Sequence, residues 1–279
     1  MSTYRIYVDS RERRSGTATE FEYALPYTLN IRERSRASVD VVVVPNSIKT
    51  VSARNDIIYV QETATIGDTQ EVRDRLVYIP EGYYTVETLR AAVQTALNGP
   101  SKFLPGAYVV EYNELMARFQ YSNDATRFND SFEIFTKESL ENPNKPASYP
   151  DIVNGVGAFR LLGLERGPSL LATIGSPIAQ SKAAPNLQQA TQLFMKSNLG
   201  MGAQSVGPGG NQSVIRRVIM DAPTFGLCID RHATAWDSIE IAGETTISTF
   251  SVELCDFQGV PVDLNGQEWS FSISIFREG

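Results

Sequence analysis

Short runs of alternating apolar and polar residues dominate the sequence. The clearest is WSFSISIF near the C-terminus, in which serines alternate with Trp269, Phe271, Ile273 and Ile275. Successive side chains of a strand point to opposite faces, so this run predicts a strand with one apolar face and one hydroxyl face. We expect it to insert between two other strands, because an unpaired strand would expose its amides. Trp269 is then a core residue.

Similar runs predict strands along most of the chain. YRIYVDS and FEYAL alternate, whereas the run from Val39 to Val44 is almost continuously β-branched. Such a continuous run is typical of a strand buried on both faces. The strands are short and separated by turn signals such as Leu264–Asn265–Gly266–Gln267. This pattern indicates a β-sandwich or barrel.

One segment has helical periodicity instead. TVETLRAAVQTALNGP repeats its apolar residues at helical spacing and predicts an amphipathic helix over about residues 85–98. Thr85 is the expected N-cap, and Gly99 followed by Pro100 predicts the C-terminal end. We expect this helix to lie across the edge or end of a sheet.

The elements together predict an all-β protein with one domain over residues 1–279. About residues 1–20 are expected to form an N-terminal arm. The poorly patterned segment from about 125 to 212 predicts long inserted loops or a small insertion domain. A mobile surface loop is expected at the glycine-rich end of this segment. The glycines of this loop match no phosphate-binding fingerprint. They are Gly200, Gly202, Gly207, Gly209 and Gly210.

Composition narrows the classes of function. Of 279 residues, 42% are hydrophobic and 20% charged, which predicts a real core. The net charge of −7 argues against a surface that binds nucleic acid broadly. The cluster RERR supplies Arg11, Arg13 and Arg14, which have two interpretations. They are either an ion-paired, solvated face or part of an arm that contacts nucleic acid or an acidic neighbour.

Residues suited to catalysis are few. His232 is the only histidine, and no nucleophile or metalloprotease motif surrounds it. Cys228 and Cys255 lie in strand-like runs and are predicted to be buried free thiols. We therefore predict no catalytic, cofactor or metal site, no membrane span, and no enzymatic activity. Two alternatives stay open: a sugar- or receptor-binding sandwich that uses Trp236, and a hydrolase that uses two carboxylates.

Several longer phrases carry a family resemblance. They are IYVDSRERRSGTATEFEYAL, VVVVPNSIKTV, IPEGYYTVETLRAAVQTAL, FRLLGL and VELCDFQGVPVDLNGQEWSFSISI. In this order, from Tyr4 to Ile275, they resemble the penton-type minor capsid proteins of virophages and polinton-like DNA viruses. The region from about 143 to 212, apart from FRLLGL, contributes little to the resemblance.

The resemblance implies a jelly-roll β-sandwich that has no catalytic site. It also implies a homopentamer at each fivefold vertex of an icosahedral capsid. Its neighbours would be a double-jelly-roll major capsid protein and other minor capsid proteins. The location would be the vertex of the virion, after assembly inside the host cell. The alternative with a similar fold is a fibre-head-like sandwich that binds a receptor or carbohydrate, and such heads form trimers.

Overall fold

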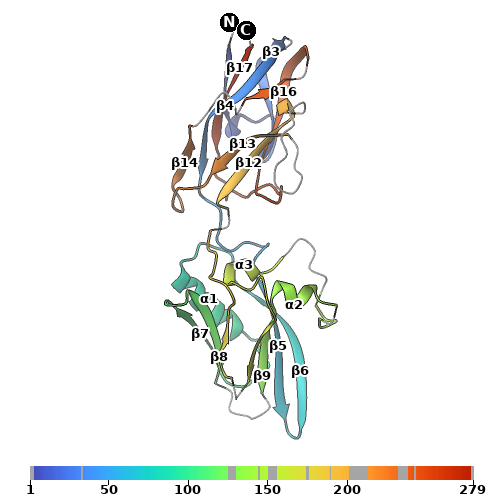
Figure 1. Ribbon diagram of the computed structural model, residues 1–279, viewed down its shortest axis with the longest axis vertical. Helices are drawn as coiled ribbons and strands as arrows, with labels where there is room; N and C mark the ends of the chain where they lie inside the picture. Colours follow the sequence, from blue (N-terminus) through green and yellow to red (C-terminus); the bar gives the residue numbers. More distant parts are fainter. Residues whose placement is uncertain are drawn as a thin grey trace. The chain divides into compact units, whose positions relative to one another are not determined.

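A computed structural model describes residues 3–32, 34–124, 130–143, 145–149, 156–173, 176–188, 190–200, 213–231, 238–241 and 243–277 (Figure 1). The chain divides into two compact units. Unit 1 comprises Met1–Ile48 and Ala190–Gly279, and unit 2 comprises Lys49–Gln189. Each unit has its own cluster of buried apolar side chains. Unit 2 is therefore an insertion within the sequence of unit 1.

Unit 1 is a sandwich of two antiparallel sheets. Its strands are β1 (Tyr4–Asp9), β2 (Ser15–Gly16), β3 (Glu20–Ile31), β4 (Ser35–Pro45), β12 (Gln192–Ser197), β13 (Val214–Ile219), β14 (Leu227–Asp230), β15 (Ile239–Glu240), β16 (Thr245–Cys255) and β17 (Ser270–Arg277). The first sheet, called the β17 sheet, has the order β1-β17-β4-β14, and β15 also pairs with β4. The second, called the β16 sheet, has the order β13-β12-β16-β3-β2.

The strand pairing of unit 1 is that of a jelly roll. Counted inward from the two ends of the unit, β1 pairs with β17, β3 with β16, β4 with β14, and β12 with β13. A hairpin-like ribbon that wraps round a core produces this nested pairing in two facing sheets. The predicted all-β, jelly-roll fold is confirmed. Unit 2 enters between β4 and β12, directly before the innermost pair β12–β13.

The terminal strand has the predicted position. β17 lies between β1 and β4, which places the N- and C-terminal strands side by side (Figure 1). Its apolar residues Phe271, Ile273 and Ile275 are buried. On its hydroxyl face Ser272 and Ser274 are buried, Ser270 is half-buried, and a bulge follows Ser272. Ser274 donates a hydrogen bond to Asp40 of β4, which satisfies one of the buried hydroxyl groups.

Unit 2 combines two small sheets with three helices. Its strands are β5 (Ile57–Ile66), β6 (Thr69–Tyr78), β7 (Tyr108–Asn113), β8 (Arg118–Asn123), β9 (Ser131–Ile134), β10 (Leu170–Thr173) and β11 (Ala179–Gln180). The sheet orders are β10-β9-β5-β6 and β11-β8-β7. The helices are α1 (Val86–Leu97), α2 (Lys137–Glu141) and α3 (Phe159–Leu162). None of the helices in the described residues is long and apolar enough to cross a bilayer.

Helix α1 covers the free edge of β7. Arg90, Gln94 and Asn98 are spaced four residues apart, so they follow one face of the helix. Asn98 Nδ2 donates to Tyr108 O at 2.8 Å, and Asn98 Oδ1 accepts from Tyr108 N at 2.9 Å. One turn away, Gln94 Oε1 accepts from Val110 N at 3.0 Å. Arg90 Nη1 donates to Val110 O, also at 3.0 Å. These side chains replace a neighbouring strand, and the predicted edge position of the helix is confirmed.

The ends of α1 agree in part with prediction. Thr85 caps the N-terminus, where its side chain accepts from Thr88 N. The C-cap is Asn98 rather than Gly99. The physical reason is that the Asn98 side chain satisfies both the carbonyl of Gln94 and the edge of β7.

A buried polar network lies at the centre of unit 2. The Glu62 side chain is fully buried and accepts three hydrogen bonds. Its donors are Arg75 Nη2 at 2.9 Å, Tyr108 Oη at 2.6 Å and Phe103 N at 2.9 Å. Arg75 Nη2 also donates to Leu97 O, at the end of α1. The network thus joins β5, β6, β7 and α1.

The unit boundaries differ from the sequence-based prediction of one domain. The inserted unit starts at Lys49 and ends at Gln189, whereas the prediction placed an insertion over about 125–212. The strands β5 and β6 alternate like those of the sandwich, so their pattern did not reveal a separate unit. Residues 4–16 also differ from the predicted arm. They form β1, a short 3-10 helix and β2, all of which are bound to unit 1.

Candidate functional site

The arginine cluster lies in a compact turn between β1 and β2. We call Asp9–Arg14 the N-terminal turn. Asp9 ends β1 and caps the 3-10 helix η1 (Ser10–Glu12), because its side chain accepts from Arg11 N at 2.9 Å. The Arg11 guanidinium returns to the same carboxylate, with Nη2 at 2.6 Å from Oδ2. Asp9 therefore fixes both the backbone of the turn and the direction of Arg11.

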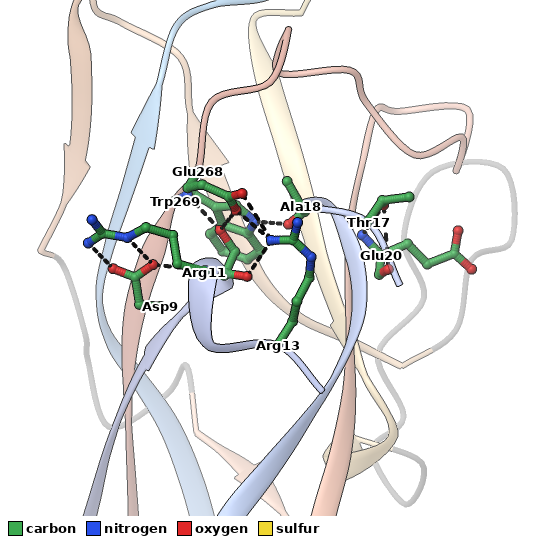
Figure 2. Close-up of polar contacts among 9 residues, drawn as sticks. Asp9, Arg11, Arg13, Thr17, Ala18, Glu20, Glu268 and Trp269 are labelled. Carbon is green, nitrogen blue, oxygen red and sulfur yellow. Dashed lines mark hydrogen bonds and ion pairs between the residues drawn. The ribbon is translucent and has the colours of Figure 1, made fainter. Parts of the chain in front are cut away.

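Glu268 joins this turn to the start of β17. Arg13 Nη1 lies 2.9 Å from Glu268 Oε1, and Trp269 Nε1 donates to Ala18 O at 2.7 Å (Figure 2). Ser10 Oγ donates to Glu268 Oε2 and accepts from Trp269 N at 3.0 Å. The indole is itself buried and stacks on Phe271 with ring centroids 5.0 Å apart. The two ends of unit 1 are therefore locked together by charge, hydrogen bonding and packing.

The hydrogen bonds of this network favour the ionised form of its carboxylates. The hydrogen bond from Ser10, followed by that from Arg13, lowers the pKa of Glu268 despite partial desolvation. The hydrogen bond from Arg11 likewise lowers the pKa of Asp9. A carboxyl group whose pKa is lowered by folding stabilises the folded state at pH values above its ordinary pKa. This stabilisation disappears as the pH falls through the lowered pKa. The lock is therefore complete at neutral pH.

The three arginines predicted to make arm contacts differ in their ion pairing. Arg11 and Arg13 are ion-paired within unit 1, which supports the interpretation of a paired face for these two. Arg14 is exposed and forms no ion pair within the described residues. Glu268 and Ser10 were missed by sequence reasoning. Arg13 and Glu268 are 255 positions apart, and no local pattern links residues so distant.

Other predicted residues lie mostly outside the described part of the chain. Gly200 ends the 3-10 helix η2 (Asn198–Gly200) after β12. Gly202, Gly207, Gly209 and Gly210 lie outside the described residues, as do His232 and Trp236.

Both cysteines are buried and free, as predicted. Cys255 Sγ donates to Phe194 O at 3.3 Å, and desolvation raises the pKa of this thiol. Since thiolates are the reactive form, Cys255 is poorly suited to nucleophilic chemistry.

A polar hollow of about 620 Å³ lies on the outer face of the β16 sheet. It is lined by Glu20, Glu22 and Glu253, and Lys196 Nζ lies 2.9 Å from Glu253 Oε1. A glycosidase acid would need a raised pKa. Desolvation raises the pKa of Asp56, but this residue belongs to unit 2 and does not line the hollow. The described residues also contain no cluster of His, Cys, Asp and Glu that could hold a metal ion.

Among comparisons with known proteins, only the comparison with solved structures gives a match. No known protein family matches the sequence, and no curated protein matches it. A crystal structure of the penton protein of mavirus is similar to this chain, with a TM-score of 0.50 and 12% sequence identity. The similarity covers 98% of this chain and 98% of that protein. The resemblance inferred from the sequence is thus confirmed at the level of the fold, which is similar over nearly the full length of both chains.

Proposed function

We propose that this protein is a capsid penton subunit, which forms homopentamers at the fivefold vertices of an icosahedral DNA virus. The observation that carries the proposal is the fold similarity to a penton protein over 98% of both chains. Because the match spans the jelly roll and the inserted unit, it supports a role for the whole chain rather than for a widespread sandwich alone. Five copies would close a ring and contact a double-jelly-roll major capsid protein around it.

The construction of unit 1 suits such a role. A ring closes only if the angle between its two contact surfaces is fixed. The nested strand pairing and the lock between the N-terminal turn and β17 make unit 1 stiff at its termini. In this proposal the protein acts through packing at subunit contacts and catalyses no reaction.

Native mass spectrometry over a range of protein concentrations tests the proposal. The expected result is a pentamer, with free monomer as the other main species. A trimer would instead favour a receptor- or carbohydrate-binding head. Electron microscopy of particles should place the chain at the vertices. A chain that stays monomeric and is absent from the vertices would refute the proposal.

The arm contact proposed for the arginine cluster now rests mainly on Arg14, since Arg11 and Arg13 are paired within unit 1. An acidic neighbouring capsid protein and the genome are both suitable partners for this exposed cation. Arg14→Glu should reduce incorporation into particles. If the partner is nucleic acid, wild-type protein should bind DNA with an affinity that falls steeply with salt.

A further inference from the structure

The outer face of the β17 sheet carries exposed apolar side chains. Along β14, Cys228 is buried, whereas Leu227 and Ile229 on the opposite face are 59% and 46% exposed. At the other side of the sheet, Tyr7 of β1 is 70% exposed. Large apolar residues in this arrangement are unusual on a surface that faces only water.

This face is also hollowed. Two adjoining hollows of about 430 and 410 Å³ share Asp9, Val43 and Ser270 as lining residues. Val41 extends the apolar floor on one side, and Pro45 and Leu227 extend it on the other. We call this combined surface the β17-sheet groove.

The rim of the groove carries charged side chains of both signs. The carboxylates of Asp9, Glu12 and Glu268 line it together with the guanidinium of Arg11. Asp9 and Glu268 are paired with arginines of the N-terminal turn. Glu12 forms no ion pair within the described residues and accepts only a long hydrogen bond, from Tyr23 Oη at 3.5 Å. The groove therefore offers an apolar floor beside one uncompensated negative charge.

A matching surface occurs on the same unit. β13 is the edge strand of the β16 sheet, and Arg217 and Ile219 point outward from it, two residues apart. Ile219 is 48% exposed, and Arg217 is exposed and forms no ion pair among the described residues. An apolar side chain beside a free cation is the chemical complement of an apolar floor beside a free carboxylate.

We infer that the β17-sheet groove is a subunit seam, occupied by the β13 edge of a second copy of this chain. This inference rests on the proposed pentamer and identifies its contact surfaces. A ring needs two different, complementary patches on every subunit, since each copy contacts the next head to tail. The groove and the β13 edge lie on opposite sheets of the sandwich, so one copy can present both at once. Ile219 packs on the apolar floor, and Arg217 pairs with Glu12.

Matched aspartate variants test the apolar part. Leu227→Asp places a charge in the groove, and Ile229→Asp places one beside it, next to the lining residue Val43. The controls Leu171→Asp and Ile66→Asp change residues of the same type and of similar exposure, 54% and 48%, in unit 2. Native mass spectrometry should show the concentration for half-assembly raised by about tenfold or more in the groove variants, and unchanged in the controls. Circular dichroism melting of each monomer checks that folding is retained.

A charge exchange tests the pairing without altering apolar packing. Glu12→Arg and Arg217→Glu should each weaken the ring, because each places like charges across the seam. The double variant Glu12→Arg/Arg217→Glu should recover at least part of the wild-type assembly.

The outcomes separate this inference from the proposed function. Groove variants that assemble into rings as readily as wild type would overturn the proposed seam and leave the pentamer intact. A double variant that assembles no better than the two single variants would do the same. Rings that form normally but no longer enter particles would show that the groove binds a different capsid protein, which also overturns the inference. A wild-type chain without rings would refute the proposed function itself.

Discussion

The two units of this chain stabilise β-structure in different ways. Unit 1 has an aliphatic and aromatic core, and its buried ion pair Arg216–Asp230 joins the edge strands β13 and β14. Unit 2 places Glu62 and Arg75 in its interior and covers a strand edge with helix side chains. Both units have an apolar core, and unit 2 adds a fully buried polar network that links four of its elements. Damage to the core of unit 1 or to the network of unit 2 should affect that unit and spare the other.

The largest expected effect is on the core of unit 1. Trp269→Ala removes a buried indole that stacks on Phe271 and packs edge-on against Phe21. The free energy of unfolding of unit 1 should fall by about 3–5 kcal/mol, as for other large-to-small core changes. Hydrogen exchange measured peptide by peptide should show faster exchange in unit 1 alone. Tyr7→Ala, at an exposed aromatic residue, is the control. Equal acceleration in unit 2 would contradict the separation of the two units.

The next largest effect concerns the network of unit 2. Glu62→Gln leaves the buried Arg75 guanidinium without a countercharge and should destabilise unit 2 by about 3 kcal/mol. Burial, followed by the Glu62 carboxylate, raises the pKa of Tyr108, so the phenol stays neutral and cannot replace the lost charge. Limited proteolysis should then cut within residues 49–189 first. Glu71→Gln removes an exposed pair with Arg73 on the same hairpin and should leave the cleavage pattern unchanged.

A smaller effect is expected at the covered edge of β7. Asn98→Leu leaves the N–H and C=O groups of Tyr108 without their partners, at a cost of about 2 kcal/mol. Exchange of the Tyr108 amide, followed by NMR, should accelerate more than that of amides at the centre of β5. Thr95→Leu, on the exposed face of the same helix, should change neither. An unchanged Tyr108 amide would show that the helix does not protect this edge.

The smallest effect is that of the terminal lock. Glu268→Gln should cost unit 1 about 1 kcal/mol at neutral pH, since it weakens the bonds from Ser10 and Arg13. The pKa of Glu268 is lowered in the folded state, so the wild-type advantage is present above the ordinary glutamate pKa and is lost as the pH falls through the lowered value. Denaturant titrations should therefore show wild type more stable than the variant at pH 7, and a smaller difference between them at pH 3. Glu20→Gln, at an exposed carboxylate, is the control. A difference that is as large at pH 3 would exclude the ionised Glu268 as its cause.

Local patterns predicted local structure well. The tail was expected between two strands and lies between β1 and β4. The Val39–Val44 run forms a strand as expected, within β4, which lies between β17 and β14. The expected burial on both faces is wrong, because Val41 and Val43 are half-buried and line the β17-sheet groove. Asn265 and Gly266 both have positive φ and form the predicted turn, in which Gln267 N donates to Leu264 O. In each case the signal lies within a few residues.

Long-range relationships were much harder to predict. Periodicity identifies a strand but not the sheet to which it belongs, so β5 and β6 gave no sign that the chain had left the sandwich. The pairing of Arg13 with Glu268 depends on the nested closure of unit 1, which no short pattern encodes. The apolar outer face of β14 was overlooked because only two of its four residues are exposed and apolar, and alternation alone does not reveal which face is inward.

The nested pairing has a consequence for synthesis on the ribosome. β1 and β4 flank β17, so the two earlier strands remain without their shared neighbour until the last strand has been made. The described strands within residues 49–189 pair with one another and can reach their native arrangement while the nascent sandwich is still incomplete. Translation should therefore yield a folded middle beside open strands, and the aggregation-prone interval of this protein is the time between synthesis of residue 189 and emergence of β17 from the ribosome.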